Sequence, residues 1–324
     1  MRGKLWLGVA LSLVLLWLAF RGVDLDEVVK GFRHIRPMWL VPALLSIFVR
    51  FWVTAIRWRI LLGPKHRVGI HRLFGVTLIG FMANNIFPAR IGEFVRAYVL
   101  GRAESLAAPL AFATIVIERI FDGLTLLLFL GGGLFFLSLP PWLLGLAAAS
   151  CCLYLVVLAI LLSLRWEGGV RFVGRLLAWL PLRLRTPAHQ LVDAFRLGLD
   201  ALGNARALLM TAGLSLVIWA INALGLQATF AAFSLALPLQ AGFLGIAIIA
   251  GILVLPSAPG YVGTFQLATK LALAPFGVPE ATALSVSIVY HAINYVPITI
   301  LGLVYLGALN LTLGEIRTAS QETP

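Results

Sequence analysis

Two hydrophobic segments of this chain are interrupted by the same short pattern. Residues 88–94 read PARIGEF and residues 259–265 read PGYVGTF, so both fit P-x-x-[IV]-G-x-F. Proline lacks the amide hydrogen and glycine accepts strained dihedral angles, so the pair breaks a helix. Broken backbone at membrane depth is tolerated only against protein or a wet cavity. A matched pair of interrupted segments in two halves of a chain is typical of a transporter's binding site.

The composition predicts an all-α polytopic membrane protein. Of 324 residues, 61% are hydrophobic and 12% are charged, with a mean hydropathy of +1.00, whereas a soluble chain has about 25% charged residues. The net charge of +12 would indicate nucleic acid in a soluble protein. Here the basic residues cluster in loops, where the positive-inside rule explains them, and we expect no nucleic-acid partner. The cysteine and histidine spacings contain no metal motif, so we expect no cofactor and no metal.

Hydropathy and loop charge predict the topology. The interrupted units cover 73–102 and 242–274, and arginine-rich segments 57–72 and 165–206 should be cytoplasmic. The N-terminus is then cytoplasmic if each interrupted unit is re-entrant, entering and leaving by one face. Alternatively, 73–88 crosses the bilayer completely as a short helix. The six predicted full spans cover 5–20, 38–62, 107–137, 143–164, 207–233 and 282–309.

The same segments predict an inverted repeat within one transmembrane domain, residues 1–310. The first repeat covers about 38–137 and the second about 207–309. Beyond the motifs, Glu118 and Asp122 align with Tyr290 and Asn294. The remaining parts are a cytoplasmic amphipathic insertion at about 165–206 and a short polar cytoplasmic tail at 311–324.

The first interrupted unit and the segment after it are rich in polar groups. Ionisable groups at membrane depth cost roughly 2.5–3.5 kcal/mol each, so they face a cavity or pair together. In one hypothesis Arg90 and Arg96 bind an anionic headgroup through their planar guanidinium forks. The acids Glu93, Glu118 and Asp122 then balance that charge, or they bind a cationic headgroup or a coupling proton. In the other, an internal Arg–Glu network holds the broken helix. The candidate substrate-binding residues here are Asn84, Asn85, Arg90, Gly92, Glu93, Arg96, Glu118, Arg119 and Asp122.

The second interrupted unit has small and hydroxyl-bearing residues instead of charges. Its glycines allow close approach of a ligand or of a neighbouring helix. His291 either relays protons or serves as a hydrogen-bonded packing residue. The candidate binding residues here are Pro259, Gly260, Gly263, Thr264, His291 and Asn294.

These motifs together resemble a known family. Asn85-x-x-Pro88-x-Arg90-x-Gly92-Glu93-x-x-Arg96, then Glu118-Arg119-x-x-Asp122 and Pro256-x-x-Pro259-Gly260-x-x-Gly263 resemble the flippase-like family, also called the lysylphosphatidylglycerol synthase transmembrane region. The resemblance covers residues 1–310. It implies lipid translocation in the prokaryotic cytoplasmic (inner) membrane, with anionic or modified phospholipid headgroups as partners. It also implies re-entrant segments around a lipid-sized cavity. Because only a short polar tail follows residue 310, we expect no aminoacyl-transferase domain and no aminoacylation.

The leading hypothesis is therefore a lipid flippase that moves a phospholipid or lipid-linked headgroup between leaflets, and that is not an enzyme. No nucleophile–base pair or metal-ligand set is found in the sequence. One alternative is an intramembrane enzyme acting on a lipid-linked substrate, with Glu93 or Glu118 as general base. Another is a non-catalytic scaffold for a lipid-synthesis complex. A lipid-synthesis enzyme as partner and a homo-oligomer both stay open.

Overall fold

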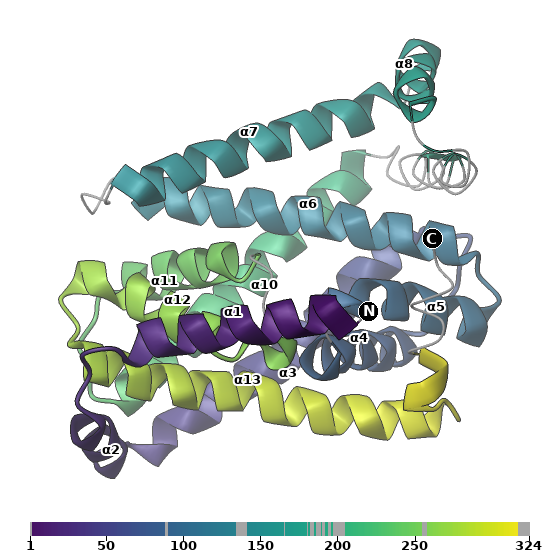
Figure 1. The fold of residues 1–324 in the computed structure, drawn as a ribbon. Coiled ribbons are helices and arrows are strands. Elements are labelled where there is room, and N and C mark those ends of the chain that lie inside the picture. Colours follow the sequence, from purple (N-terminus) through teal and green to yellow (C-terminus); the bar gives the residue numbers. More distant parts are fainter. Residues whose placement is uncertain are drawn as a thin grey trace.

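The computed structural model describes residues 2–87, 90–133, 141–164, 166–179, 205–254 and 258–316, together with isolated positions between 181 and 196. This part of the chain is helical and contains no strand (Figure 1). The predicted all-α class is confirmed. Pro88, Pro256, parts of the 165–206 insertion and the last eight residues of the predicted tail lie outside the described residues.

The helices follow the predicted segments closely. In chain order they are α1 (Arg2–Phe20), α2 (Leu25–Arg33), α3 (Leu40–Leu62), α4 (Ile70–Ile86), α5 (Gly92–Glu104), α6 (Ala108–Gly133), α7 (Pro141–Ser163), α8 (Glu167–Leu177), α10 (Ala205–Ala232), α11 (Leu239–Ile252), α12 (Thr264–Leu273) and α13 (Glu280–Ala308). Short 3₁₀ turns occur at Pro37–Trp39 (η1), Pro259–Tyr261 (η3) and Ala274–Phe276 (η4).

Each repeated motif separates two helices. The first lies between α4 and α5, where Arg90 has a φ of 52°. The second lies between α11 and α12 and contains η3, where Gly260 and Gly263 have φ values of 72° and 85°. Positive φ values of this kind favour glycine, and they occur where the chain must change direction. The predicted breaks are therefore present in the backbone, at the motifs that predicted them.

Three segments have the length and apolar composition of a membrane span among the described residues: Pro37–Leu62, Ala205–Ala232 and Glu280–Ala308. The sequence predicted six. One difference has a clear cause, because α6 is 26 residues long but carries Glu118, Arg119 and Asp122 in its middle. Such residues are rare in lipid-facing segments and common in helices that line protein interiors.

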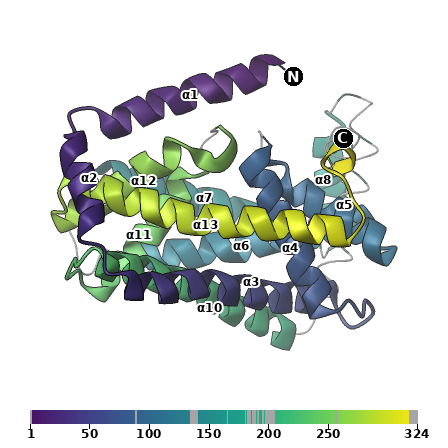
Figure 2. The ribbon, with the colours of Figure 1, turned by 90° about the horizontal axis from the view of Figure 1, so that it is seen from below.

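The two halves of the chain make corresponding helix contacts. In the first half α3 contacts α4, α4 contacts α5, and α5 contacts α6; in the second, α10 contacts α11, α11 contacts α12, and α12 contacts α13. Across the halves, α4 packs on α13 and α11 packs on α6, while α3 and α10 lie side by side (Figure 2). The long helix that follows each interrupted unit, α6 or α13, thus packs against the interrupted unit of the other half, α11 or α4.

The chain stays packed beyond the predicted domain end at residue 310. Leu311 and Ile316 are buried in the cluster that contains residues of α4 and α5. Thr312 and Glu315 form a capped turn, in which the Glu315 side chain accepts a hydrogen bond of 2.8 Å from the Thr312 amide. This bond, the Thr312 hydroxyl and Arg102 together hold the pKa of Glu315 below its usual range. Residues 311–316 therefore belong to the folded domain.

Candidate functional site

A cavity of about 220 Å³, here called the central cavity, lies where the two breaks meet. Residues from α3, α4, both breaks, α10, α11, α12 and α13 line it. Its apolar walls come mainly from α11 and from aromatic side chains. The polar and tyrosine side chains that line it are Arg50, Asn84, Asn85, Arg90, Asn222, Tyr261, Tyr290, His291, Asn294 and Tyr295.

The two repeated motifs contact each other at this cavity. The guanidinium of Arg90, from the first motif, lies 5.0 Å from the ring centre of Tyr261 in the second. The Tyr295 hydroxyl donates a hydrogen bond of 3.4 Å to the backbone oxygen of Asn85. A Cβ atom on Gly260 would lie only 2.7 Å from the Tyr295 ring. Glycine is therefore required for the close approach of the second break to α13.

The second break is held by a hydrogen-bonded pair, His291 and Gln266. The Gln266 side-chain oxygen accepts from the Gly263 amide at 2.8 Å, so its nitrogen is left to donate to His291 Nδ1, 3.1 Å away. Nδ1 then carries no proton, and Nε2–H donates to the Gly260 backbone oxygen at 2.8 Å. The imidazole is therefore neutral in this arrangement, and it fixes the backbone of the break.

Replacement of His291 by phenylalanine is expected to lower the free energy of unfolding by about 1–3 kcal/mol, because the Gly260 and Gln266 groups lose their partners. Phenylalanine keeps the ring stacking on Phe265, whose centre is 4.5 Å from that of His291. The measurement is thermal unfolding of the purified protein in detergent. His71→Phe is the matched control, since His71 is exposed and should change stability by less than about 0.5 kcal/mol. Equal effects of the two variants would contradict the assigned role.

The first break is held by asparagines. Asn84 accepts a hydrogen bond of 2.7 Å from the amide of Gly92. Asn85 donates to the Thr299 hydroxyl of α13 at 2.8 Å. The helices on either side touch closely, because a Cβ on Gly92 would lie 2.2 Å from the Gly80 backbone oxygen. Asn84 thus satisfies a backbone amide at the break, and Asn85 links the end of α4 to α13.

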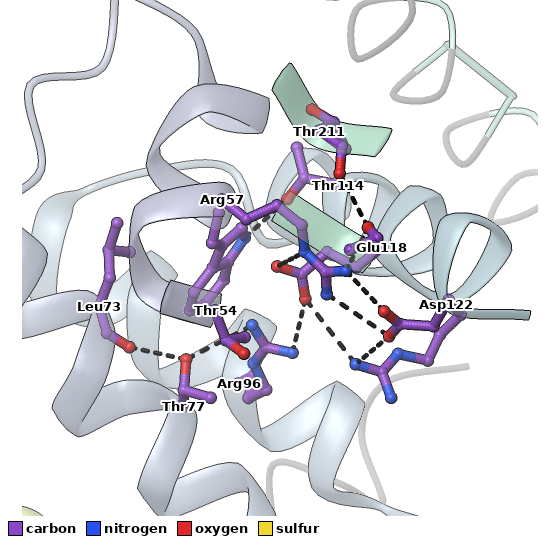
Figure 3. Close-up of polar contacts among 12 residues, drawn as sticks. Thr54, Arg57, Leu73, Thr77, Arg96, Thr114, Glu118, Asp122 and Thr211 are labelled. Carbon is purple, nitrogen blue, oxygen red and sulfur yellow. Dashed lines mark hydrogen bonds and ion pairs between the residues drawn. The ribbon is translucent and has the colours of Figure 1, made fainter. Parts of the chain in front are cut away.

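A buried ion network, here called the ion network, joins Arg57, Arg96, Glu118 and Asp122 (Figure 3). Arg57 of α3 binds Asp122, and Arg96 of α5 binds Glu118 at 2.9 Å. Arg57 and Arg96 are 1% and 2% exposed and Glu118 is 0% exposed. Arg119, whose side chain is 37% exposed, binds Asp122 at 3.1 Å. The network joins three helices of the first half.

Indole rings support the ion network on two sides. The Arg96 guanidinium lies 4.1 Å from the ring centre of Trp58, and the indole N–H of Trp58 donates to Thr114 at 2.9 Å. Trp219 of α10 donates to Asp122 at 3.0 Å and also lines the central cavity. Trp219 is therefore a direct physical link between the ion network and the cavity.

The structure divides the predicted site residues between distinct places. Arg90 lines the central cavity, whereas Arg96 binds Glu118 and is not among the described lining residues. Glu93 is half-buried in the first turn of α5, and Thr264 is fully buried. Asn84, Asn85, Arg90, His291 and Asn294 line the cavity; Arg96, Glu118, Arg119 and Asp122 form the ion network; Gly92, Pro259, Gly260 and Gly263 shape the two breaks.

Two arginines were missed by the sequence analysis. Arg57 was counted with the cytoplasmic loop charges of segment 57–72, yet it is a buried member of the ion network. It lies inside because Asp122 and the Ser215 hydroxyl, 2.7 Å away, bind its guanidinium. Arg50 lines the central cavity from the middle of α3. The available signal was the same for both, namely an arginine within a long apolar segment.

The fold and the site define an all-helical membrane protein with two broken helical units around a polar cavity. The chain belongs to the family described as the lysylphosphatidylglycerol synthase TM region, whose model matches residues 5–302. The resemblance found in the sequence is thereby confirmed. Among curated relatives, two UPF0104 membrane proteins of Methanothermobacter thermautotrophicus are each 25% identical, with alignments covering 85% and 82% of this chain and 87% and 83% of theirs.

A third relative corrects one prediction. Glycosyltransferase AglD of Haloferax volcanii is 28% identical over 94% of this chain, and the chain spans about half, 54%, of that protein's length. A relative with the name of an enzyme contradicts our expectation that the chain is not one. That expectation depended on the lack of a nucleophile–base pair and of a metal-ligand set.

Proposed function

We propose that this protein binds a membrane lipid by its headgroup in the central cavity and moves it between the leaflets of the cytoplasmic membrane. The observation that carries the proposal is the meeting of the two broken helices at a cavity that holds Arg50 and Arg90. Within the described residues neither arginine has an ion-pair partner. Unpaired cations at membrane depth are costly and are typical of substrate pathways.

The proposed topology has a cytoplasmic N-terminus, six spans and two re-entrant units related by an inverted repeat. The matching helix contacts of the two halves support it, as does the packing of each long helix on the other half's broken unit. In transporters of this design, one half moves against the other around a fixed site. Movement of the first half against the second, at the contacts of α4 with α13 and of α6 with α11, would expose the central cavity to each side in turn.

Arg90→Ala is expected to lower the rate of lipid movement about tenfold or more, because a charge-assisted hydrogen bond contributes roughly 1.5–3 kcal/mol and 1.4 kcal/mol is tenfold. The measurement is the leaflet accessibility of headgroup-labelled lipids in liposomes that contain the purified protein. Arg72→Ala serves as control, since Arg72 is a half-exposed surface arginine paired with Glu104. Unchanged transport by folded Arg90→Ala protein would refute the proposal.

The AglD relative supports a second proposal, that the chain takes part in glycosyl transfer to a membrane lipid. Glu118 is enclosed and bound to Arg96, so the role of general base falls to the half-buried Glu93. Its carboxylate would accept the proton of the acceptor hydroxyl as that oxygen displaces the leaving group of an activated sugar. A lipid product heavier by one sugar, absent with Glu93→Gln, would favour this proposal over movement alone.

A further inference from the structure

We infer that the central cavity selects headgroups that combine a phosphate with hydroxyl groups, as in polyol or sugar phosphates, and excludes cationic headgroups. The inference rests on the proposed lipid-binding function and specifies its substrate class. It follows from the charge, the hydrogen-bonding groups and the size of the cavity.

The charge of the cavity favours an anion. Its described lining includes Arg50 and Arg90 but neither aspartate nor glutamate. The Nε atoms of both arginines are buried and have no hydrogen-bond partner among the described residues. His291 adds no charge, because its Nδ1 accepts from Gln266. Two guanidinium groups without a carboxylate suit a phosphate, which they bind in a planar fork.

Three carboxylates lie around the cavity without lining it, namely Asp122, Glu118 and Glu93, and Glu93 interacts electrostatically with Tyr261 and Arg119. Asp122 reaches the cavity wall through Trp219, but it is already bound by Arg57 and Arg119. Glu118 is bound by Arg96. The ion network contains three arginines and two carboxylates, so it has an excess of positive charge. With Arg50 and Arg90 of the lining, five arginines face these three carboxylates, so a cationic headgroup would meet a net positive charge.

The asparagines of the cavity present both donors and acceptors. The amide nitrogen of Asn294 donates to the Tyr290 backbone oxygen, which leaves its side-chain oxygen as an acceptor. The side-chain oxygen of Asn222 accepts from the Tyr290 hydroxyl, which leaves its amide hydrogens as donors. Hydroxyl groups both donate and accept, so they match this mixture. The rings of Tyr261 and Tyr295 supply flat apolar faces beside these groups.

The size of the cavity indicates that only the headgroup enters. Its volume of about 220 Å³ is below the roughly 300–1,000 Å³ of pockets that enclose a drug-sized ligand. The acyl or isoprenoid chains would stay outside, against the apolar helix surfaces. The selectivity therefore depends on the headgroup.

Lipid binding to the purified full-length protein tests the inference, measured by native mass spectrometry with phosphatidylinositol, phosphatidic acid, phosphatidylcholine and lysylphosphatidylglycerol. We expect phosphatidylinositol to bind about tenfold or more tightly than phosphatidylcholine or lysylphosphatidylglycerol, whose headgroups carry a cationic group, a difference of about 1.4 kcal/mol. Free inositol phosphate should displace it. Preferred binding of a cationic headgroup, or no displacement by the free headgroup, would overturn the inference.

Two variants separate the phosphate from the hydroxyl groups. Arg50→Gln should weaken the binding of phosphatidylinositol and of phosphatidic acid by similar factors, because both lipids carry the phosphate. Asn294→Ala should weaken the binding of phosphatidylinositol alone, because phosphatidic acid has no headgroup hydroxyl beyond its phosphate. Arg72→Gln, a surface change, should alter neither. If Asn294→Ala weakens both lipids equally or neither, the assigned hydroxyl recognition is wrong.

The inference and the proposed function fail in different ways. If phosphatidylinositol binds selectively but no lipid moves between leaflets, the transport proposal fails and the selectivity stands. If phosphatidylcholine moves as fast as phosphatidylinositol, and Arg50→Gln slows neither, transport stands and the selectivity fails.

Discussion

Replacement of Glu118 by alanine is expected to lower the free energy of unfolding by about 3–5 kcal/mol, since removal of one partner leaves buried charge uncompensated. Glu118 is 0% exposed and binds Arg96 at 2.9 Å. It also lies 3.8 Å from the Nε of Arg57. Without it, the contacts of the Arg96 guanidinium with the described residues are reduced to a 3.5 Å hydrogen bond to Thr77 and the position over Trp58. Thermal unfolding in detergent, together with the yield of folded protein, measures the effect.

Two comparisons make the Glu118 prediction specific. Glu315→Ala removes a partly exposed carboxylate that pairs with Arg102 and caps the turn at Thr312. A surface pair contributes about 0–1 kcal/mol and a cap about 1 kcal/mol, which together stay below the loss expected for Glu118→Ala. The double variant Glu118→Leu with Arg96→Met should recover much of the lost stability, because apolar replacement of both partners removes the unpaired charge. If Glu118→Ala unfolds like Glu315→Ala, or if the double variant is worse than the single, the network does not stabilise the fold as described.

The parts of this fold that could be predicted from sequence are those set by local chemistry. The breaks at 88–94 and 259–265 follow from proline and glycine alone, since these residues disrupt a helix wherever the segment lies. Glu118 and Asp122 share a helix face because they are four residues apart. Composition alone was enough to assign the membrane class.

The ion partners could not be predicted, because they come from distant parts of the chain. Asp122 is paired with Arg57, and nothing between these positions specifies the contact; it results from the packing of α3 on α6. The spacing of three residues between Arg90, Glu93 and Arg96 would place them on one side of a continuous helix, but the backbone at Arg90 has a positive φ and α5 begins only at Gly92. Arg90 therefore lies against Tyr261 of the second break, whereas Arg96 is buried on α5.

Replacement of Gly263 by alanine is expected to destabilise the protein by about 2–6 kcal/mol, from backbone strain of roughly 1–3 kcal/mol and overpacking of roughly 1–3 kcal/mol. Gly263 has φ 85° and ψ −54°, close to the rare and strained γ-turn conformation. A Cβ there would lie 2.4 Å from the Ser12 backbone oxygen and 2.8 Å from the Leu16 amide nitrogen, both in α1. These are backbone atoms, so the contact can be relieved only by displacement of the whole α1 helix.

Displacement of α1 would also disturb the second break. The Ser12 hydroxyl accepts a hydrogen bond of 2.7 Å from the Ala258 amide, just before η3. We therefore expect Gly263→Ala to weaken two contacts at once, the packing of α1 on α12 and the anchoring of the break. The movement can be measured with the variant Ala19→Cys, in which the exposed Cys151 and Cys152 are replaced by serine. Ala19 is fully buried beside α2 and α13, so faster labelling of the new thiol reports that α1 has moved.

Gly277→Ala is the control that separates strain from contact. Gly277 also has a positive φ, 68°, but a Cβ there would meet nothing within 4 Å. Gly277→Ala should lower the free energy of unfolding by about 1–2 kcal/mol, the cost of a left-handed backbone conformation for alanine. The thiol at residue 19 should stay protected from labelling. If both glycine variants give the same unfolding temperature and the same labelling rate, the contact of α1 with the second break contributes nothing. A larger loss and faster labelling in Gly263→Ala alone would establish that α1 holds the second break in place.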